Sequence, residues 1–444
     1  MGLKDFFHNR WTKFIFWALL YTLWVIWLGN YWWLLGLVIV FDLNVTKKVH
    51  WLFWQKEYKE GEKKNELLDW VDALIFAVVV VTFVNIFFIQ SFKIPSSSME
   101  STLYTGDHLF VEKLTYGPRV LETPLTIPFT HNVCFGKESY STLIHNDYRR
   151  LKGFRAPQNG DIVVFGFPNG DTVLTKSPTE DYYSLCRTFG RDNVIRQLGP
   201  VKVRPKDKKD HYVKRCVAIP GDTLQVIDGL VYINGKAQEV YPGIQLSYEV
   251  KTNGQKVNSK IIENLGLNAG ELFFDPGLPG YPAMPLTAAQ LEEIRKISNV
   301  ESVECNLDTC QIDLPTDLFP FTETGWTRDY YGPLWIPEKG ATVELTAENL
   351  PLYERLISVY EGNTLELGPD GQILINGEIA RSYTFKQDYF FMMGDNRHNS
   401  FDSRYWGFVP EDHLVGRPSM IWLSTEAGKK FPKNIRWNRF LKFV

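Results

Sequence analysis

Two long apolar runs near the N-terminus constrain this chain more than any other feature. Residues 14–43 are almost continuously apolar, and residues 71–92 form a second run, VDALIFAVVVVTFVNIFFIQSF. A helix needs roughly 20 apolar residues to cross a bilayer, whereas strands rarely reach this length. The first run is also far longer than the apolar part of a secretory signal peptide, and no small-residue cleavage site follows it. The chain is therefore expected to begin with transmembrane helices.

The first run is too long for one untilted crossing and a little short for two. Gly29-Asn30 lies in its middle and is a turn signal. Lys and Arg residues flank the run on both sides, and cytoplasmic loops carry the excess of these residues. Both flanks are therefore expected on the cytoplasmic side, which requires an even number of crossings. We predict a hairpin over residues 14–43 and a third span over residues 71–92, with a single first crossing as the alternative.

The rest of the chain has mainly the pattern of β structure. Asp-Gly at 228–229 and Asn-Gly at 234–235 are typical of tight hairpin turns, and residues 108–113 alternate as in a strand. One helix is expected over residues 286–298, where Thr287 could cap its start. The predicted fold class is mainly β, with N-terminal transmembrane helices followed by an antiparallel β domain that carries inserted α/β regions.

One stretch of this β pattern recurs within the chain. The sequence GDTLQVIDGLVYING at 221–235 returns as GNTLELGPDGQILING at 362–377, one residue longer. The match indicates either a duplication or two unrelated hairpins that use the same turn residues. When the match is extended backward without a gap, Arg355 falls opposite Lys214. An arginine cannot give up its proton in a protein, so a duplicated copy would lack a base at this position.

Composition and cysteine use exclude several classes of protein. The formal net charge of −3 gives no basic footprint for nucleic acid. None of the five cysteines forms a CxxC pair, and the acidic residues lack the spacing of an EF-hand, so no metal and no cofactor is predicted. Only Cys305 and Cys310 are close in sequence. They could form a disulfide if this region lies outside the cytoplasm, or they could remain two buried thiols.

Three short segments contain the residues with the strongest catalytic potential. They are IPSSSMES at 94–101, directly after the second apolar run, HYVKRCVAIPGD at 211–222 and MGDNRHNSFDSRYWGF at 393–408. A serine becomes a nucleophile only when a neighbouring group accepts its proton. His108 is the closest candidate in sequence, but it lies in a strand pattern with no nearby partner.

Together, and in this order behind an apolar run, the three segments resemble bacterial type I signal peptidases, which are membrane-anchored serine proteases with a Ser–Lys dyad. The resemblance covers residues 91–116, 158–168, 211–236 and 392–424. It implies a membrane-bound serine endopeptidase that removes N-terminal signal peptides from exported preproteins.

The resemblance also assigns roles to individual residues. It implies Ser98, directly before Met99 in the motif, as the nucleophile and Lys214 as the general base. A lysine near its ordinary pKa is protonated at neutral pH, so burial must lower the pKa of Lys214. The supporting residues that the resemblance implies are Ser96 for the oxyanion, Ser400 to orient the base, Asp395 in the GDN turn, and the ion pair of Asp402 with Arg404.

Substrate selection follows from the expected position of the serine at the outer membrane surface. Signal peptides end in small residues at positions −1 and −3 before the cleavage site. Such an extended segment could add as a strand beside residues 92–96 and 211–214. The resemblance implies shallow substrate pockets lined by Ile94, Met99, Tyr212 and Val213.

Two residues depart from the family pattern. Ser97 stands where the family usually has glycine, and Ser101 stands where it usually has proline. Neither change removes a catalytic atom, so the departures affect only the expected shape of the loop around Ser98.

The expected organisation has four parts. They are a membrane anchor at 1–92 with a basic cytoplasmic loop at 44–70, a catalytic β domain at 93–239 and 351–424, an insertion at 240–350, and a basic tail at 425–444. A smaller insertion is expected at 118–157. The resemblance places the anchor in the inner (plasma) membrane of a bacterial cell, with the catalytic domain on the outer, periplasmic face. The expected partners are preproteins and the lipid bilayer, and no nucleic acid.

Two other function classes remain open. One is a self-cleaving Ser–Lys protease of the SOS-repressor type, which would need a DNA-binding domain where this chain has apolar runs. The other is a non-catalytic, membrane-anchored β domain that binds partners, which would be marked by the loss of Ser98 or Lys214. Both residues are present.

Overall fold

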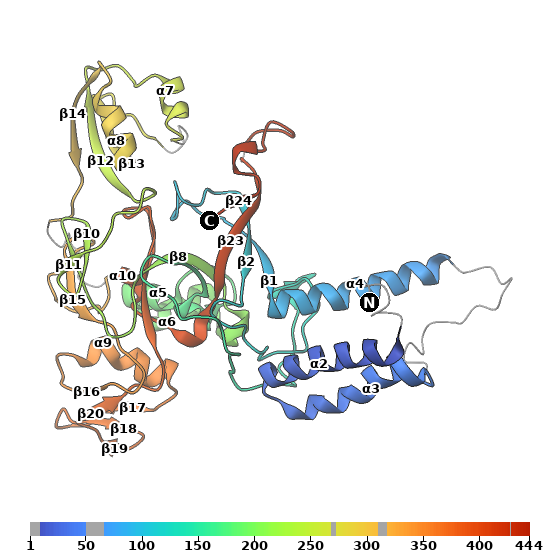
Figure 1. Ribbon diagram of the computed structural model, residues 1–444. Helices are drawn as coiled ribbons and strands as arrows, with labels where there is room; N and C mark the ends of the chain where they lie inside the picture. The colour runs from blue at the N-terminus through green and yellow to red at the C-terminus, as the bar shows by residue number, and fades with distance from the viewer. Residues whose placement is uncertain (1–8, 50–65, 268–271, 310–317, 427) are drawn as a thin grey trace.

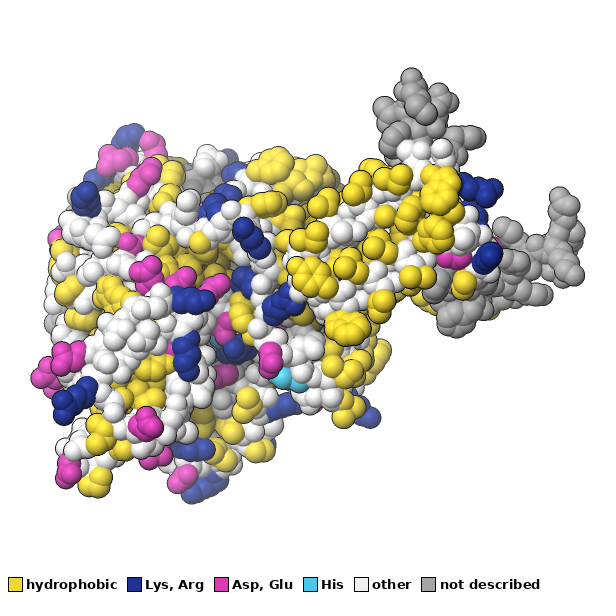
Figure 2. Space-filling model, turned by 60° about the horizontal axis from the view of Figure 1, so that its bottom comes forward, with side chains coloured by type: hydrophobic (Ala, Val, Ile, Leu, Met, Phe, Trp, Pro, Cys, Tyr) yellow, Lys and Arg dark blue, Asp and Glu magenta, His cyan; other side chains and the backbone are white. Residues whose placement is uncertain are grey.

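The computed structural model describes residues 9–49, 66–267, 272–309, 318–426 and 428–444 (Figure 1). Its N-terminal helices project from a strand-rich body. The N-terminal elements are α2 (Arg10–Leu28), η1 (Tyr31–Gly36), α3 (Leu37–Phe41), η2 (Asp42–Thr46) and α4 (Glu66–Phe87). Hydrophobic side chains cover much of the projecting helices (Figure 2).

The chain reverses directly after α2. Gly29 has a left-handed φ of 65°, which glycine adopts without a Cβ clash, and the side chain of Asn30 accepts a hydrogen bond from the Trp32 amide. The returning arm packs against α2, with the rings of Phe14 and Phe41 5.2 Å apart. Two described helices, Arg10–Leu28 and Asp69–Phe87, are long and apolar enough to cross a membrane, whereas Tyr31–Thr46 is shorter. Three spans therefore remain a prediction.

The second apolar run ends as a helix earlier than its composition suggests. Helix α4 stops at Phe87, and residues Ile89–Lys93 form strand β1, which pairs with β2 (Asp107–Glu112). The expected span over residues 71–92 is therefore too long at its C-terminal end. Gln90 and Ser91 interrupt the apolar run there, and pairing with β2 satisfies the backbone groups of β1.

The central sheet is antiparallel, as predicted, and its strand order is β1-β2-β23-β5-β8-β21-β22, with β24 paired to β23. The other strands of this sheet are β5 (Ile162–Gly166), β8 (His211–Ala218), β21 (Tyr389–Met393), β22 (Val409–Pro410), β23 (Leu414–Ser424) and β24 (Lys442–Phe443). Side chains alternate between two cores: Val163 and Phe165 enter one, and Val164 enters the other. Strands β1 and β8 are separated by three strands, yet residues of both line one groove, so the sheet is curled.

The repeated sequence forms the same structure twice. The first copy contains β9 (Thr223–Ile227) and β10 (Leu230–Ile233) and is followed by β11 (Lys236–Ala237). The second contains β17 (Leu365–Leu367) and β18 (Ile373–Ile375) and is followed by β19 (Glu378–Ile379). Asn234 and Asn376 occupy equivalent turns with φ of 52° and 54°. The side-chain oxygen of Asn234 accepts from the Thr223 amide, and that of Asn376 accepts from the Thr364 amide. The equivalence ends upstream, because Arg355 lies in a helix and Lys214 in a strand.

Residues within the predicted insertion at 240–350 form a small lobe (Figure 1). It consists of β12 (Gln245–Thr252), α7 (Ser259–Asn264), β13 (Gly280–Thr287), α8 (Ala288–Arg295) and β14 (Val300–Cys305), with β12 in the centre of the sheet. Thr287 caps α8 and forms a capping box with Gln290, which confirms the predicted helix start. Strand β15 (Tyr331–Trp335) leaves the lobe and pairs with β9. The possible disulfide partner Cys310 lies outside the described residues.

Short elements connect these units. They are β3 (Val133–Cys134), β4 (Lys137–Glu138), η3 (Pro168–Asp171), β6 (Thr172–Leu174), α5 (Tyr182–Phe189), α6 (Arg191–Leu198), β7 (Val201–Val203), η4 (Lys206–Lys208), β16 (Thr342–Glu344), α9 (Leu350–Arg355), η5 (Leu356–Tyr360), β20 (Ser382–Thr384), α10 (Ser403–Trp406), η6 (Glu411–His413) and η7 (Trp437–Arg439).

The C-terminal segment is folded onto the central sheet. Strand β24 pairs with β23, and the buried Arg439 forms a bidentate ion pair with Asp107, with Nη2 2.6 Å and Nε 3.2 Å from its carboxylate oxygens. Large aromatic side chains of the same segment, including Phe431 and Trp437, remain exposed. The segment thus combines a buried attachment with an aromatic outer surface.

Candidate active site

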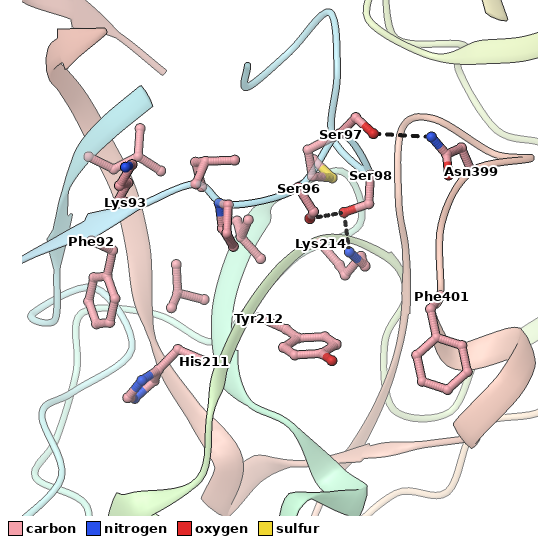
Figure 3. A pocket seen from close by; sticks show the side chains of 16 residues that line it. Phe92, Lys93, Ser96, Ser97, Ser98, His211, Tyr212, Lys214, Asn399 and Phe401 are labelled. Atoms are coloured by element: carbon pink, nitrogen blue, oxygen red, sulfur yellow. Dashed lines mark hydrogen bonds between the residues drawn. The ribbon is translucent and has the colours of Figure 1, made fainter. Parts of the chain in front are cut away.

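The side chains of Ser98 and Lys214 lie next to each other in the structure (Figure 3). Ser98 lies in the loop between β1 and β2, and Lys214 lies in the middle of β8. Lys214 Nζ is 2.5 Å from Ser98 Oγ, and the two side chains are among the buried polar groups, at 4% and 8% exposure. The structure therefore brings a hydroxyl and an amine, 116 residues apart in sequence, within hydrogen-bond distance.

The surroundings of Lys214 make its neutral form more accessible than that of an exposed lysine. Burial lowers its pKa to about 8, and the carboxylates of Asp402 and Asp395 offset part of this effect. A neutral amine has a lone pair that can accept a proton from a serine hydroxyl. The arrangement can therefore supply a general base at mildly alkaline pH.

The loop around Ser98 accommodates both departures from the family pattern. Ser97 Oγ accepts a hydrogen bond from Asn399 Nδ2 at 3.1 Å, so the extra side chain joins two sides of the site. Ser101 has a φ of 67°, which proline cannot adopt because its ring holds φ near −65°. Ser96 Oγ lies 3.5 Å from Ser98 Oγ, on the groove side of Ser98 (Figure 3).

The carboxylate of Asp395 accepts hydrogen bonds from Arg215 and Thr102, two residues that the sequence does not link to it. Its carboxylate accepts from Arg215 Nε at 2.7 Å, from Arg215 Nη2 at 2.6 Å and from Thr102 Oγ1 at 2.5 Å. Arg215 follows Lys214 in β8, and Thr102 follows the Ser98 motif, so Asp395 connects the three segments that were expected to form the site. The position of Arg215 directly after Lys214 was the only sequence signal that Arg215 belongs to the site. The sequence does not show that Arg215 pairs with Asp395, which lies 180 residues away.

The loop 394–404 also contains the expected ion pair of Asp402 with Arg404. Arg404 donates to both carboxylate oxygens of Asp402 at 2.9 and 2.8 Å, and both residues are buried. Ser400 is buried beside Gly394, where an added Cβ would collide with Ser400 and with the carbonyl oxygen of Ser98. Ser400 Oγ has no hydrogen-bond partner within the described residues, so its contact with Lys214 remains a prediction.

A groove of about 390 Å³ leads to the serine. All four residues expected to bind substrate line it, namely Ile94, Met99, Tyr212 and Val213. The ring of Tyr212 stacks on Phe167 with centroids 4.5 Å apart, which fixes one wall. Asn399 and Phe401 also line the groove and were not identified from the sequence.

Neither His108 nor His211, the histidine at the start of the segment that contains Lys214, forms a hydrogen bond with Ser98 among the described residues. His108 packs against Trp422, with ring centroids 5.3 Å apart, and His211 packs against His131 and Phe92 farther along the groove. No group of three or more His, Cys, Asp or Glu side chains that could hold a metal ion occurs in the described parts of the chain.

Comparisons with known proteins show the family to which this chain belongs. The family model described as signal peptidase, peptidase S26 matches residues 67–275 and 347–423. The interval between the two matched parts, 276–346, falls within the segment predicted to be an insertion, 240–350, whereas the first matched part includes residues 240–275 of that segment.

Several relatives are similar over most of the chain. A signal peptidase I of Haemophilus influenzae is 24% identical over 392 residues, which cover 88% of this chain and 79% of the relative. Signal peptidase I of Helicobacter pylori is 23% identical, over 84% of this chain and 91% of the relative. Signal peptidase I of Buchnera aphidicola is 24% identical, over 85% and 82%. The chain belongs to the signal peptidase family, peptidase S26, and is a serine endopeptidase.

Proposed function

We propose that this protein is a membrane-bound endopeptidase that removes signal peptides from exported preproteins, with Ser98 as nucleophile and Lys214 as general base. The observation that carries the proposal is the 2.5 Å approach of Lys214 Nζ to Ser98 Oγ at the end of an open groove. The relatives that bear the name signal peptidase I support the substrate class.

In the proposed first step, neutral Lys214 takes the proton of Ser98 as Oγ attacks the scissile carbonyl. The developing oxyanion is stabilised by hydrogen bonds from the Ser96 hydroxyl and the Ser98 amide. Protonated Lys214 then gives its proton to the leaving amine, which releases the mature protein and leaves an acyl-enzyme. Lys214 next activates a water molecule, which hydrolyses the ester and frees the signal peptide.

The supporting residues keep the base in place. Asp395, through Arg215, fixes the strand that carries Lys214, and the pair of Asp402 with Arg404 fixes the loop that carries Ser400. We propose that Ser400 orients Lys214, since its buried hydroxyl and the carbonyl oxygen of Ser98 both lie against Gly394.

The groove suits an extended peptide with small side chains near the cleavage site. Residues 92–96 and 211–214 form its two sides, and a substrate strand between them would place its scissile bond at Ser98. Ile94, Tyr212 and Val213 would leave room only for small residues at −1 and −3.

The proposed topology has a cytoplasmic N-terminus, a hairpin, and a third span that ends near Phe87. It places the groove, which begins at Phe92, next to the outer face of the plasma membrane. Reporter fusions at residue 1 and after residue 30 test it, and an outward N-terminus would leave two spans.

The direct test is release of a labelled signal peptide by the purified full-length protein in detergent. The wild-type protein should cleave a preprotein after a small residue at −1, and the Ser98→Ala protein should not. Cleavage only of its own chain would favour the self-processing alternative, and no cleavage would favour the binding domain.

A further inference from the structure

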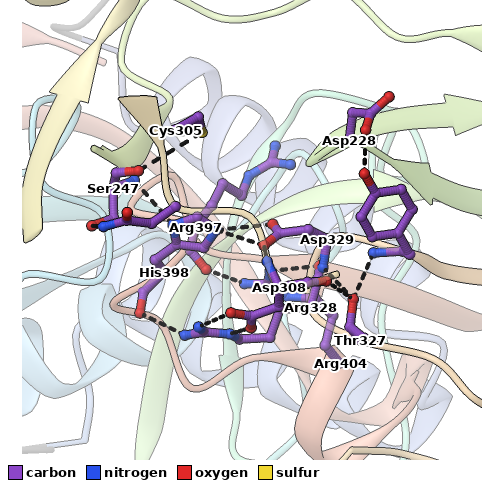
Figure 4. A network of polar contacts seen from close by, with 12 residues as sticks. Asp228, Ser247, Cys305, Asp308, Thr327, Arg328, Asp329, Arg397, His398 and Arg404 are labelled. Atoms are coloured by element: carbon purple, nitrogen blue, oxygen red, sulfur yellow. Dashed lines mark hydrogen bonds and ion pairs between the residues drawn. The ribbon is translucent and has the colours of Figure 1, made fainter. Parts of the chain in front are cut away.

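The small lobe that contains β12, α7, β13, α8 and β14, called the insertion lobe below, contacts the loop that contains Asp395 and Ser400 (Figure 4). Gln245 is the first residue of β12. Its backbone N–H donates to the Asp395 carbonyl at 2.8 Å, and its backbone carbonyl accepts from the Arg397 backbone N–H at 3.0 Å. Gln245 and Asn396 form a parallel bridge. The central strand of the lobe thus begins as a backbone partner of the active-site loop.

One side chain of the loop extends this attachment. His398 Nδ1 accepts a hydrogen bond from the Ser247 amide at 3.0 Å, and its Nε2 lies 2.9 and 3.0 Å from the two carboxylate oxygens of Asp329. Because Nδ1 is an acceptor here, the proton is on Nε2 and is donated to Asp329. The side chains of His398 and Asp329 are only 7% and 1% exposed, so water competes little for either bond.

The partners of His398 are themselves fixed. The carboxylate of Asp329 accepts from the Asp308 amide at 2.9 Å, and Arg328 donates to the His398 carbonyl at 3.3 Å. Asp308 and Arg328 form a further ion pair. His398 therefore connects the loop to two backbone segments, β12 and the approach to β15, which are anchored independently of it.

The same loop contacts the nucleophile on its other side. The backbone N–H of Asn396 donates to the Ser98 carbonyl at 3.1 Å, and its side-chain amide donates to the Ser97 carbonyl at 3.3 Å. We propose that His398 is a positioning residue of the reaction, and that it holds the loop 394–400 against Ser98 by fastening it to the insertion lobe. This inference rests on the proposed function of Ser98 and Lys214 and gives the insertion a role in catalysis.

Loss of this attachment should reduce turnover more than substrate binding. Most of the groove is formed by residues 92–99 and 211–214, whereas the loop supports the atoms that react. A misplacement of about 1 Å in a catalytic group can reduce a rate by roughly 10²-fold. His398→Ala is therefore expected to lower kcat by roughly 10- to 100-fold with KM changed by less than about 3-fold.

The experiment compares kcat, KM and thermal unfolding of full-length variants in detergent on a labelled preprotein. His398→Gln should recover part of kcat, because an amide offers one donor and one acceptor in place of the imidazole. Asp329→Ala should resemble His398→Ala, and the double variant should be no worse than either single one. The matched control is Tyr281→Phe, which removes the hydroxyl that accepts from the Val257 amide inside the lobe without touching the loop.

The positioning role predicts that Tyr281→Phe lowers thermal stability but keeps kcat, whereas His398→Ala lowers kcat. Equal kcat values for His398→Ala, Tyr281→Phe and the wild type would overturn the inference, as would a fall in kcat for both variants in proportion to stability. Ser98→Ala separates this outcome from the proposed function. If Ser98→Ala is inactive and His398→Ala is not impaired, only the positioning role fails; if Ser98→Ala still cleaves, the proposed function fails.

Discussion

Two lysines five residues apart have similar burial but different neighbours. Lys209 and Lys214 are 2% and 4% exposed, and burial lowers the pKa of each to about 8. Lys214 Nζ lies against Ser98 Oγ at the end of the groove, whereas Lys209 Nζ lies 2.6 Å from His413 Nε2 and 3.2 Å from the Pro168 carbonyl.

Lys209 is part of a line of polar groups that continues through His413 and Asp412 to Lys206. His413 Nδ1 lies 2.5 Å from Asp412, which also pairs with Lys206. Burial lowers the pKa of His413 to about 4, so at neutral pH its ring is uncharged, accepts from protonated Lys209 and donates to Asp412. Lys209 Nζ has two hydrogen-bond partners, and no hydroxyl is among its partners in the described part of the chain. A lowered lysine pKa therefore does not identify a base unless a nucleophile and a groove accompany it.

The largest expected effect is the loss of the proposed dyad. Ser98→Ala, Lys214→Ala and Lys214→Arg should each reduce kcat/KM by roughly 10²–10⁴-fold or more, since guanidinium cannot accept the proton. The double variant Ser98→Ala/Lys214→Ala should be about as inactive as either single one, because the two residues act as a unit. Steady-state cleavage of a labelled preprotein measures this, and a Lys214→Arg protein with near wild-type activity would remove the distinction between the two lysines.

Ser400→Ala should have a smaller effect on the same reaction. If Ser400 orients Lys214, loss of one hydrogen bond worth roughly 1 kcal/mol corresponds to about a 5- to 10-fold fall in kcat. Folding should be unaffected, since Ser400 Oγ has no other partner within the described residues. Unchanged kcat for Ser400→Ala would show that Lys214 needs no such support.

Lys209→Met should separate stability from activity. It removes the donor to His413 and Pro168, and a hydrogen bond to a charged group contributes roughly 1.5–3 kcal/mol, so the melting temperature should fall. The kcat/KM value should remain within about 3-fold of the wild type, because Lys209 does not contact Ser98. A loss of activity comparable to that of Lys214→Ala, in protein that remains folded, would contradict the comparison.

The smallest expected effect concerns the C-terminal segment, which we predict to lie on the membrane surface. Replacing the exposed Phe431, Trp437 and Phe443 with serine should weaken binding of the soluble domain to anionic vesicles and leave catalysis of a soluble peptide unchanged. Deletion of the segment is a poorer test, since it also removes the buried pair of Arg439 with Asp107. Unchanged vesicle binding would show that these rings face solvent.

The sequence predicts local features well and distant pairings poorly. The antiparallel class, the turns at Asn234 and Asn376 and the cap at Thr287 depend on a few adjacent residues and were predictable. The end of α4 was not, because an apolar run can continue as a strand once a pairing partner is available. Arg215 and Asp395 are 180 residues apart, and the contact of His398 with Asp329 depends on how the lobe packs; neither leaves a local pattern.

The most direct test of the account is the pH dependence of kcat/KM for the wild-type protein, with Lys209→Met as the control. Below a pKa of about 8, Lys214 is protonated and cannot accept the Ser98 proton, so activity should fall on acidification with a midpoint about 8. The control should give the same midpoint, because Lys209 takes no part in the reaction. A midpoint near 6.5, the ordinary value for histidine, together with loss of activity on replacing His211, would contradict the assignment of Lys214 as the base.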